Sequence, residues 1–341
     1  MIRIVLDAMG SDEHPSPEVD AAGRSVARWP EPLTLAGPRN LLEPLLTRKG
    51  LPPERVTIAD ASEVLEMTDH AASSARGKAD SSMAVGIDLL RHAQADAFVT
   101  AGNTGGAMST GLMRLGRLHG VRRPALAAFF PVRGGRTVIL DIGANVDCKP
   151  EYLLQFAVMG SVYAQTALGK PFPRVGLISN GEERGKGTAL IHETYPLLEA
   201  AGLNFVGNVE AKEIYDGAVD VAVTDGFSGN IFLKTSEAVA RFLTEVIRDE
   251  IRSGAVTSIG GMLARPAFGR VRRLLDPAEY GAVPLLGLNG LVFVGHGRSD
   301  GRALVNAIGA ARAAVEAGLL EALRKALEPY LHHPSTAEPT A

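Results

Sequence analysis

Short apolar runs alternate with helix-like patterns along most of this chain. An apolar run followed by an amphipathic helical segment is typical of a largely parallel sheet whose two faces are both covered by helices. The chain is therefore predicted to be an α/β protein. The runs lie at residues 3–6, 33–36, 56–59, 97–101, 138–142, 175–179, 205–209, 219–224 and 291–294.

Glycine-rich polar segments follow several of these runs. Sheets of this class bind their ligands at the carboxyl ends of the strands, so the segments are expected to share one cleft. Asn, Asp and Ser also favour helix N-termini for structural reasons, and Ser228 and Ser299 are equally well explained as caps. The segments are residues 7–12, 101–106, 141–150, 179–187, 224–230 and 295–300.

The segment 179–187 has the composition of an anion-binding loop. Its glycines allow backbone N–H groups to turn inward, and a helical pattern follows it. It is not a nucleotide P-loop, because only three residues separate Gly181 from Gly185 and no Ser or Thr follows Lys186. A dinucleotide fingerprint and a G-x-S-x-G elbow are also missing. What remains fits an anion such as inorganic phosphate, with further donors for an oxyanion formed during acyl transfer.

Two later segments have more than one interpretation. Residues 231–248 form a helical pattern with a charged stripe that contains Lys234, which either faces solvent or, in the first turn, faces the cleft. Residues 252–275 contain arginines but no acid, interleaved with apolar residues. Such a stretch can lie on an anionic bilayer or receive an acidic protein, but a surface helical hairpin is the simpler interpretation.

Length, charge and cysteine content narrow the possibilities. The 341 residues suffice for one large α/β unit with a subsidiary lobe, and a net charge of −3 argues against nucleic-acid binding. Cys148 is the only cysteine, which excludes an internal disulfide and fits a reducing cytoplasm. The chain shows no signal peptide and no apolar window of ~20 residues. We predict a catalytic unit over 1–331, an extension around 245–280, and a flexible tail at 332–341 containing His332 and His333.

The loop motifs, taken in order, resemble the bacterial phosphate acyltransferases of the PlsX type. The resemblance rests on Asp7-Ala8-Met9-Gly10, Ala101-Gly102-Asn103-Thr104-Gly105, residues 141–147, Ser179-Asn180-Gly181-Glu182-Glu183, residues 224–230 and Pro284 to Gly290. It implies acyl transfer from acyl carrier protein to inorganic phosphate, giving acyl phosphate for phospholipid synthesis. It also implies a three-layer α/β/α fold like those of phosphotransacetylases and of isocitrate and isopropylmalate dehydrogenases. A cytoplasmic homodimer with peripheral membrane contact, without metal or cofactor, is expected.

Within this resemblance we expect direct attack of phosphate on the thioester, because phosphate is itself an adequate nucleophile. Asn230 and the other cleft asparagines would orient the carbonyl or the oxyanion. His296, with Asp300 nearby, would serve as acid or cation for the leaving thiolate, with Lys149 as the second choice. The expected phosphate-binding residues are Ser179, Asn180, Gly181, Lys186 and Gly187. The expected acyl- or thioester-binding residues are Asn103, Thr104, Asn145, Lys149, Asp225, Ser228, Gly229 and Lys234.

Alternatives remain at this stage. Cys148 could be a covalent nucleophile activated by Lys149 and a helix start, although a lone Cys at such a turn is more often passive packing. An enzyme of the phosphotransacetylase type using acyl-CoA would place the same residues in its cleft. A protein that recruits acyl carrier protein at the membrane without turnover is the alternative from another class.

Overall fold

The computed structural model describes residues 1–330, and the predicted tail at 332–341 lies outside them. All the predicted strands are present, but they are divided between two sheets. The first sheet is built from β1 Ile4–Asp7, β2 Leu33–Gly37, β3 Val56–Asp60, β4 Ala97–Thr100, β5 Ala125–Leu126, β11 Ala282–Leu286 and β12 Leu291–Gly295. The second is built from β6 Ala128–Val132, β7 Gly135–Leu140, β8 Arg174–Ile178, β9 Asn204–Val209 and β10 Val221–Val223.

Most neighbouring strands run parallel, as the alternation of apolar runs and helices predicts. The first sheet has the order β3-β2-β1-β4-β12-β11-β5, and only the pairs made by β11 are antiparallel. The second has the order β6-β7-β10-β8-β9, with β6 antiparallel to β7. The strands β5, β6 and β11 escape prediction because they are very short or contain a proline, Pro131 or Pro284, which is unusual inside a strand.

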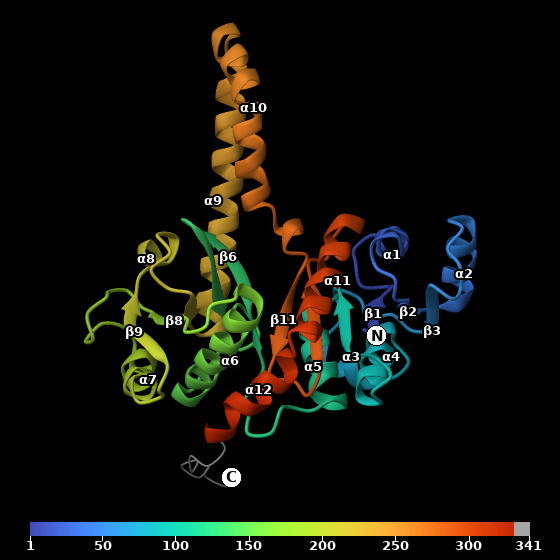
Figure 1. Cartoon of the computed structure of the whole chain (residues 1–341), viewed down its shortest axis with the longest axis horizontal. Coiled ribbons are helices and arrows are strands. Elements are labelled where there is room, and N and C mark those ends of the chain that lie inside the picture. Colours follow the sequence, from blue (N-terminus) through green and yellow to red (C-terminus); the bar gives the residue numbers. More distant parts are fainter. Residues whose placement is uncertain (331–341) are drawn as a thin grey trace.

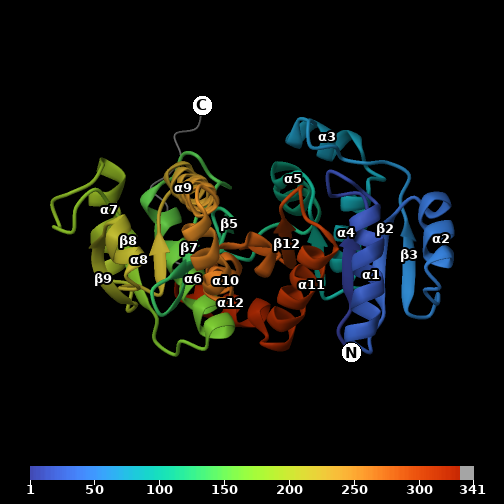
Figure 2. The ribbon, with the colours of Figure 1, turned by 90° about the horizontal axis from the view of Figure 1, so that it is seen from above.

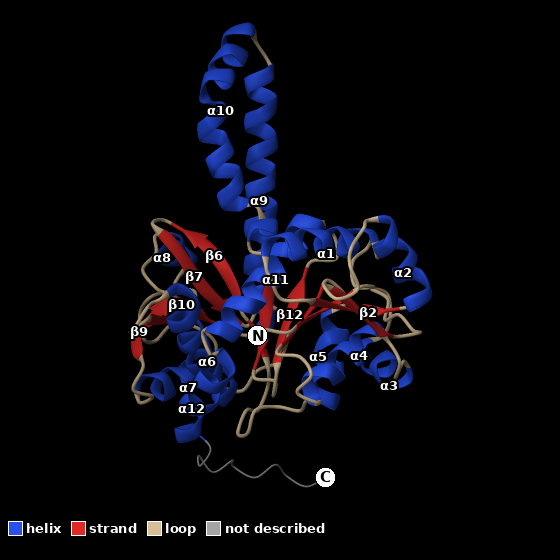
Figure 3. Ribbon diagram, turned by 45° about the vertical axis from the view of Figure 1, so that its right-hand side comes forward, coloured by secondary structure: helices blue, strands red, loops and turns tan. Residues whose placement is uncertain are grey.

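Helices cover both faces of the sheets and complete the layered arrangement (Figure 3). The helix α6 is buried almost all round, which explains why its sequence is apolar without a polar face. It packs against strands of the second sheet and against α12, and α11 packs on the first sheet, so α11 and α12 tie the two sheets together. The helices are α1 Ser16–Arg28, α2 Arg39–Arg48, α3 Ala71–Gly77, α4 Ser82–Arg91, α5 Thr104–Arg114, α6 Pro150–Leu168, α7 Ala189–Glu199, α8 Ala211–Tyr215, α9 Gly226–Arg252, α10 Ala255–Leu275, α11 Gly301–Glu316 and α12 Leu319–Leu327, with 3₁₀ turns at Pro277–Glu279 and Glu328–Tyr330.

The two longest of these helices, α9 and α10, form a hairpin that stands clear of the body (Figures 1 and 3). Seen from above, the hairpin is viewed end-on between the two lobes (Figure 2). No residue of α10 is buried, and α9 is buried only at Gly226 and Gly229 in its first turn. The first turn of α9 is therefore its anchor in the body.

In the described part of the chain, no single helix is long and apolar enough to cross a membrane. Only α11 taken together with the segment 319–330, across a 55° bend, has a suitable length and composition.

Candidate functional site

Three strand-end loops of the second lobe leave the sheet side by side. Val223 near the end of β10 is paired with Leu140 of β7 on one side and with Leu177 of β8 on the other. Parallel neighbours lie about 4.8 Å apart, so the loops that follow them emerge at one edge. These loops are residues 141–149, 179–188 and 224–225 with the first turn of α9.

A buried carboxylate organises the first loop. Asp141 is fully buried, and its two oxygens accept backbone N–H groups from Leu126 (3.0 Å), Gly143 (3.2 Å), Ala144 (3.1 Å) and Asn145 (2.7 Å). Burial raises the pKa of this carboxyl, and the hydrogen bonds oppose that rise. Asp141 is therefore a structural centre of the loop and not an open ligand.

The side chain of Asn145 is used inside the same loop. Its Nδ2 donates to the carbonyl oxygen of Pro124 at 2.7 Å and to Asp141 Oδ2 at 2.9 Å. An amide nitrogen has two hydrogens, so neither is left for a substrate oxygen. Asn145 was expected to contact the acyl group, and in this structure its amide donors position the loop.

Two glycines let α9 begin directly on this loop. A Cβ at Gly229 would lie 1.9 Å from the carbonyl oxygen of Asp141, and one at Gly226 would lie 2.5 Å from that of Asn145. Asp225 caps the helix, accepting the N–H and the hydroxyl of Ser228, both at 2.8 Å. The sequence placed Asp225, Ser228 and Gly229 in contact with the acyl group, but here their contacts bring the helix N-terminus to the loop.

The groups that remain open at this junction are few. Gly143 is exposed at φ +140°, and a Cβ there would lie 3.7 Å from the Asn230 side-chain amide. No hydrogen bond occupies this amide among residues 1–330. Lys234 follows one turn later and is exposed, and it makes no ion pair in the described chain. A shallow hollow of about 380 Å³ runs along this face of α9, lined by Asn230, Ile231, Lys234, Thr235, Ala238 and Val239.

The loop after β8 is held from the neighbouring strand. Asn208 donates its Nδ2 to the carbonyl of Glu183 at 3.0 Å, and the N–H of Ser179 donates to Val209 at 3.0 Å. The Lys186 stem lies over Gly181, where a Cβ would come within 2.7 Å of it. The ammonium group is exposed and has no ion pair among the described residues. Asn180 is exposed, and Gly187 has φ +107°.

The strand-end loops of the first lobe are also tied together. Thr100 donates its hydroxyl to Asp7 Oδ2 at 2.7 Å, which joins β4 to β1. The N–H of Asp12 donates to Gly297 at 2.8 Å, so the loop after β1 supports the loop after β12. Asp7 is buried, and burial raises the pKa of its carboxyl.

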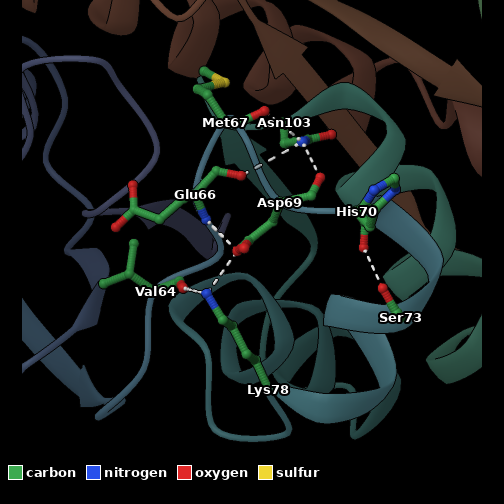
Figure 4. Close-up of polar contacts among 8 residues, drawn as sticks. All are labelled: Val64, Glu66, Met67, Asp69, His70, Ser73, Lys78 and Asn103. Atoms are coloured by element: carbon green, nitrogen blue, oxygen red, sulfur yellow. Dashed lines mark hydrogen bonds and ion pairs between the residues drawn. The ribbon is translucent and has the colours of Figure 1, made fainter.

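Asn103 connects the start of α5 to the loop at residues 66–69 (Figure 4). Its Oδ1 accepts the N–H of Gly106 at 2.9 Å, which makes it the helix cap. Its Nδ2 donates to the carbonyls of Met67 at 3.0 Å and Asp69 at 3.3 Å. Asn103 was expected to orient the substrate carbonyl, and in this structure its amide holds the 66–69 loop beside α5. Thr104, the first residue of that helix, is exposed.

His296 and Asp300 do not meet in this structure. Asp300 caps α11, accepting the N–H of Ala303 at 2.8 Å. His296 is exposed, and its Nδ1 receives only a long contact of 3.5 Å from the N–H of Arg298. His296 thus remains free to face a ligand, while Asp300 has a structural task.

Comparison with known proteins decides the family. The model of a family described as fatty acid synthesis protein matches residues 2–322. A phosphate acyltransferase of Myxococcus xanthus is 47% identical over 331 residues, covering 96% of this chain and 94% of the relative. One of Acidobacterium capsulatum is 47% identical over 324 residues, covering 94% and 95%. The chain belongs to the phosphate acyltransferase family. It is an acyltransferase of fatty acid and lipid metabolism, as the loop motifs indicate.

Solved structures confirm the fold class of this phosphate acyltransferase. A phosphotransacetylase from Streptococcus pyogenes has a TM-score of 0.60 at 19% identity, covering 92% of this chain and 94% of its own. A putative 4-hydroxythreonine-4-phosphate dehydrogenase from Salmonella typhimurium has a TM-score of 0.53 at 12% identity, covering 92% and 99%. At such identities the likeness concerns the fold alone. It supports the predicted α/β architecture with largely parallel strands.

Cys148 of the acyltransferase is poorly suited to covalent catalysis. The thiol is half-buried, and burial raises its pKa to about 12, with nearby carboxylates adding to the effect. A thiol is a nucleophile only as the thiolate, so at neutral pH this group is almost entirely inert. Lys149, the next residue, is the N-cap residue of α6. Its side chain is exposed and makes no capping hydrogen bond.

Sequence reasoning passed over two positions of the acyltransferase that the structure makes prominent. Gly143 borders Asn230, and its place between an aspartate and an asparagine in a strand-end loop was the available signal. Glu18 is fully buried in α1 and accepts the N–H of Ser11 at 3.0 Å. An acid directly before Val19 in a helical pattern was the only sign of it.

Proposed function

We propose that this enzyme transfers a fatty acyl group from the thioester of acyl carrier protein to inorganic phosphate and releases acyl phosphate for phospholipid synthesis. The observation that carries the proposal is the junction of Gly143 with the first turn of α9. There the open amide of Asn230 lies at the N-terminus of a long helix, one turn before the unpaired Lys234. Such a group of donors favours a developing negative charge.

The reaction fits direct transfer. A phosphate oxygen attacks the thioester carbon, the carbonyl oxygen becomes an oxyanion, and the carbon–sulfur bond then breaks to release the thiol. Asn230 would donate to the oxyanion, and Lys186 with Ser179, Asn180, Gly181 and Gly187 would hold phosphate on the neighbouring loop. His296 would supply the proton or positive charge for the leaving sulfur, with Lys149 as the second choice. The hollow beside Lys234 would receive the start of the acyl chain.

Several residues first assigned to the substrate act, in this proposal, by positioning others. Asn145, Asp225, Ser228 and Gly229 bring α9 to the loop after β7. Asn103 holds the loops at the carboxyl end of the first sheet. Asp300 starts α11 and so fixes the end of the loop that carries His296.

One assay tests the proposal against its alternatives. Purified protein is mixed with long-chain acyl carrier protein and phosphate, and acyl phosphate is trapped with hydroxylamine as the hydroxamate. Phosphate-dependent hydroxamate is expected. Product formed only from acyl-CoA would favour a phosphotransacetylase-like enzyme. Carrier binding without product would favour a recruiting protein.

Replacing Cys148 by Ser should leave kcat within about twofold of the wild type, because a thiol of such high pKa takes no part in direct transfer. Mass spectrometry of wild-type enzyme incubated with acyl carrier protein in the absence of phosphate should show no acyl adduct. A stable adduct on Cys148, together with an inactive variant, would contradict direct attack.

The helical hairpin supports two further parts of the proposal, a homodimer and peripheral membrane contact. Large apolar side chains are exposed along both helices, including Phe242 (61%), Val256 (84%) and Leu263 (76%). Exposed apolar surface of this extent marks an interaction site. A second copy would cover α9, and the basic, apolar helix α10 with Arg265, Arg270, Arg272 and Arg273 would lie along an anionic bilayer.

Replacing Arg270, Arg272 and Arg273 by Glu should reduce co-flotation with vesicles that contain anionic lipid, because each basic residue near such a surface contributes about 1 kcal/mol. The melting curve and the elution volume of the variant serve as controls for folding and assembly. Unchanged flotation of a folded variant would contradict membrane contact through this segment.

A further inference from the structure

A second basic surface lies far from the hairpin. From Ala97 to Leu140 the chain has arginines but neither Asp nor Glu. Several of these arginines are engaged: Arg114 pairs with Asp88, Arg133 with Asp216, and Arg136 lies over the ring of Tyr280. Those in the segment 117–123, which we call the arginine loop, form no ion pair among the described residues. The loop follows α5 and lies at the opposite end of the molecule from the hairpin tip (Figure 1).

The arginine loop is held in a defined shape. Leu118 and Val121 are buried, and the side chain of Gln155 in α6 hydrogen-bonds the backbone on either side of Val121. Its Nε2 donates to the carbonyl of Gly120 at 2.8 Å, and its Oε1 accepts the N–H of Arg122 at 2.8 Å. Within the loop the guanidinium of Arg117 donates to the Arg122 carbonyl. The side chains of Arg122 and Arg123 are therefore presented to solvent from a rigid base.

The loop is connected directly to the candidate site. Arg123 precedes Pro124, whose carbonyl accepts the Asn145 amide at 2.7 Å, and the N–H of Leu126 donates to Asp141 at 3.0 Å. The guanidinium of Arg123 lies 6.0 Å from the ring of Tyr152 in the first turn of α6. The arginine loop thus borders residues 141–149, the same loop that meets Asn230.

The surface beside it has the other features of a docking site. Val146, 64% exposed, and the exposed Lys149 lie on the adjoining loop. Two acids, Asp147 and Glu151, are also exposed there, yet neither forms an ion pair with the arginines in the described chain. An apolar side chain among unpaired cations suits an acidic partner, since charge attracts the partner and the apolar contact retains it.

We propose that the arginine loop, with Lys149, is the docking surface for the acidic carrier protein that delivers the acyl thioester. The inference rests on the proposed function and adds to it the place of docking. A chain with a net charge of −3 needs a local cluster of cations to attract an acidic protein. This cluster forms no ion pair in the described chain and borders the loop 141–149, whereas the arginines of α10 stand on a hairpin that leaves the body. The carrier thus docks at one end of the molecule and leaves the hairpin to the membrane or to a second copy.

The test compares two donors for one enzyme. The variant Arg122→Glu/Arg123→Glu should raise the KM for acyl carrier protein by about tenfold or more, because charge reversal at an interface slows association. The KM for the neutral thioester acyl-pantetheine and both kcat values should stay within about twofold. Raising the ionic strength from about 0.05 to about 0.3 M should raise the wild-type KM for the carrier and leave that of the variant nearly constant.

The matched control is Arg48→Glu/Arg91→Glu, which makes the same change of net charge at two exposed arginines without an ion pair in the described chain. This control should keep the wild-type KM for the carrier. Direct binding of unacylated carrier to each variant gives a second measurement that needs no turnover. An unchanged carrier KM and affinity in the arginine-loop variant would overturn the proposal, as would an equal loss with both donors. Wild-type enzyme that is inactive with both donors would instead refute the proposed function.

Discussion

Replacing Asn230 by Ala lowers kcat for acyl phosphate formation by about 100-fold to 1,000-fold, the usual result of removing one oxyanion donor. The reason lies in its position just after the first turn of α9, beside Gly143, where its side chain has no hydrogen-bond partner in the described chain. A donor that acts only on the transition state affects kcat and kcat/KM together and leaves the KM almost unchanged. Steady-state kinetics with saturating phosphate measure this.

Two further variants sharpen this prediction. Asn230→Asp has the same shape but places an acceptor where a donor is needed, so its kcat should fall at least as far. Glu237→Ala, on the charged stripe two turns later, is the control and should behave as the wild type. Because no hydrogen bond holds the Asn230 side chain, the melting temperature should be unchanged in Asn230→Ala. A variant with normal kcat, or one that loses activity only by unfolding, would remove Asn230 from the mechanism.

Replacing Glu18 by Gln stabilises the protein at alkaline pH and has little effect at acid pH. Glu18 is fully buried, and one of its oxygens, Oε2, has no hydrogen-bond partner in the described chain. Burial raises its pKa from the ordinary 4.5 to about 7, and nearby Asp7 adds to the rise. The stabilising contribution of the neutral form is complete below pH 4.5 and is lost as the pH rises through 7. Above that pH the buried charge of Glu18 lowers the free energy of unfolding of the wild type, and Gln carries no such charge.

The expected gain in the free energy of unfolding is up to roughly 3 kcal/mol at about pH 8.5 and close to zero at about pH 4.5. Thermal melts of both proteins across this range measure it. Glu13→Gln, which removes an exposed carboxylate from the loop just before α1, should give no pH-dependent difference. A difference between Glu18→Gln and the wild type that is equal at both ends of the range would show that the substitution acts by packing and not by charge.

The strands show which parts of the fold can be predicted from the local pattern of apolar residues. Fully buried strands such as β1, β4 and β10 read as continuous apolar runs, because both faces of a parallel strand are covered. Strand β11 contains Pro284 and β5 has only two residues, and both depend on neighbours distant in the sequence. The two sheets end on the short strands β5 and β6, which the apolar runs do not reveal, so the division into two sheets could not be predicted from the parallel runs alone.

The asparagines illustrate the same limit at the site. Asn103, Asn145 and Asn230 have the same side chain and stand in similar loops. The amide of Asn103 donates to backbone carbonyls 34 and 36 residues away, and that of Asn145 to a carbonyl 21 residues away. The amide of Asn230 makes no such bond in the described chain. No local pattern separates them, because what distinguishes them is the presence of a distant acceptor.

By itself, the sequence determined the α/β class, the recurrence of glycine, asparagine and aspartate after the strands, and the family, since these depend on local spacing and on ordered motifs. Only the tertiary structure decided which of those side chains are free. A hydrogen bond to a distant backbone group satisfies a polar side chain and removes it from chemistry. The tertiary structure left Asn230, Lys234, Lys186 and His296 open, and it placed an arginine loop without ion pairs in the described chain beside residues 141–149.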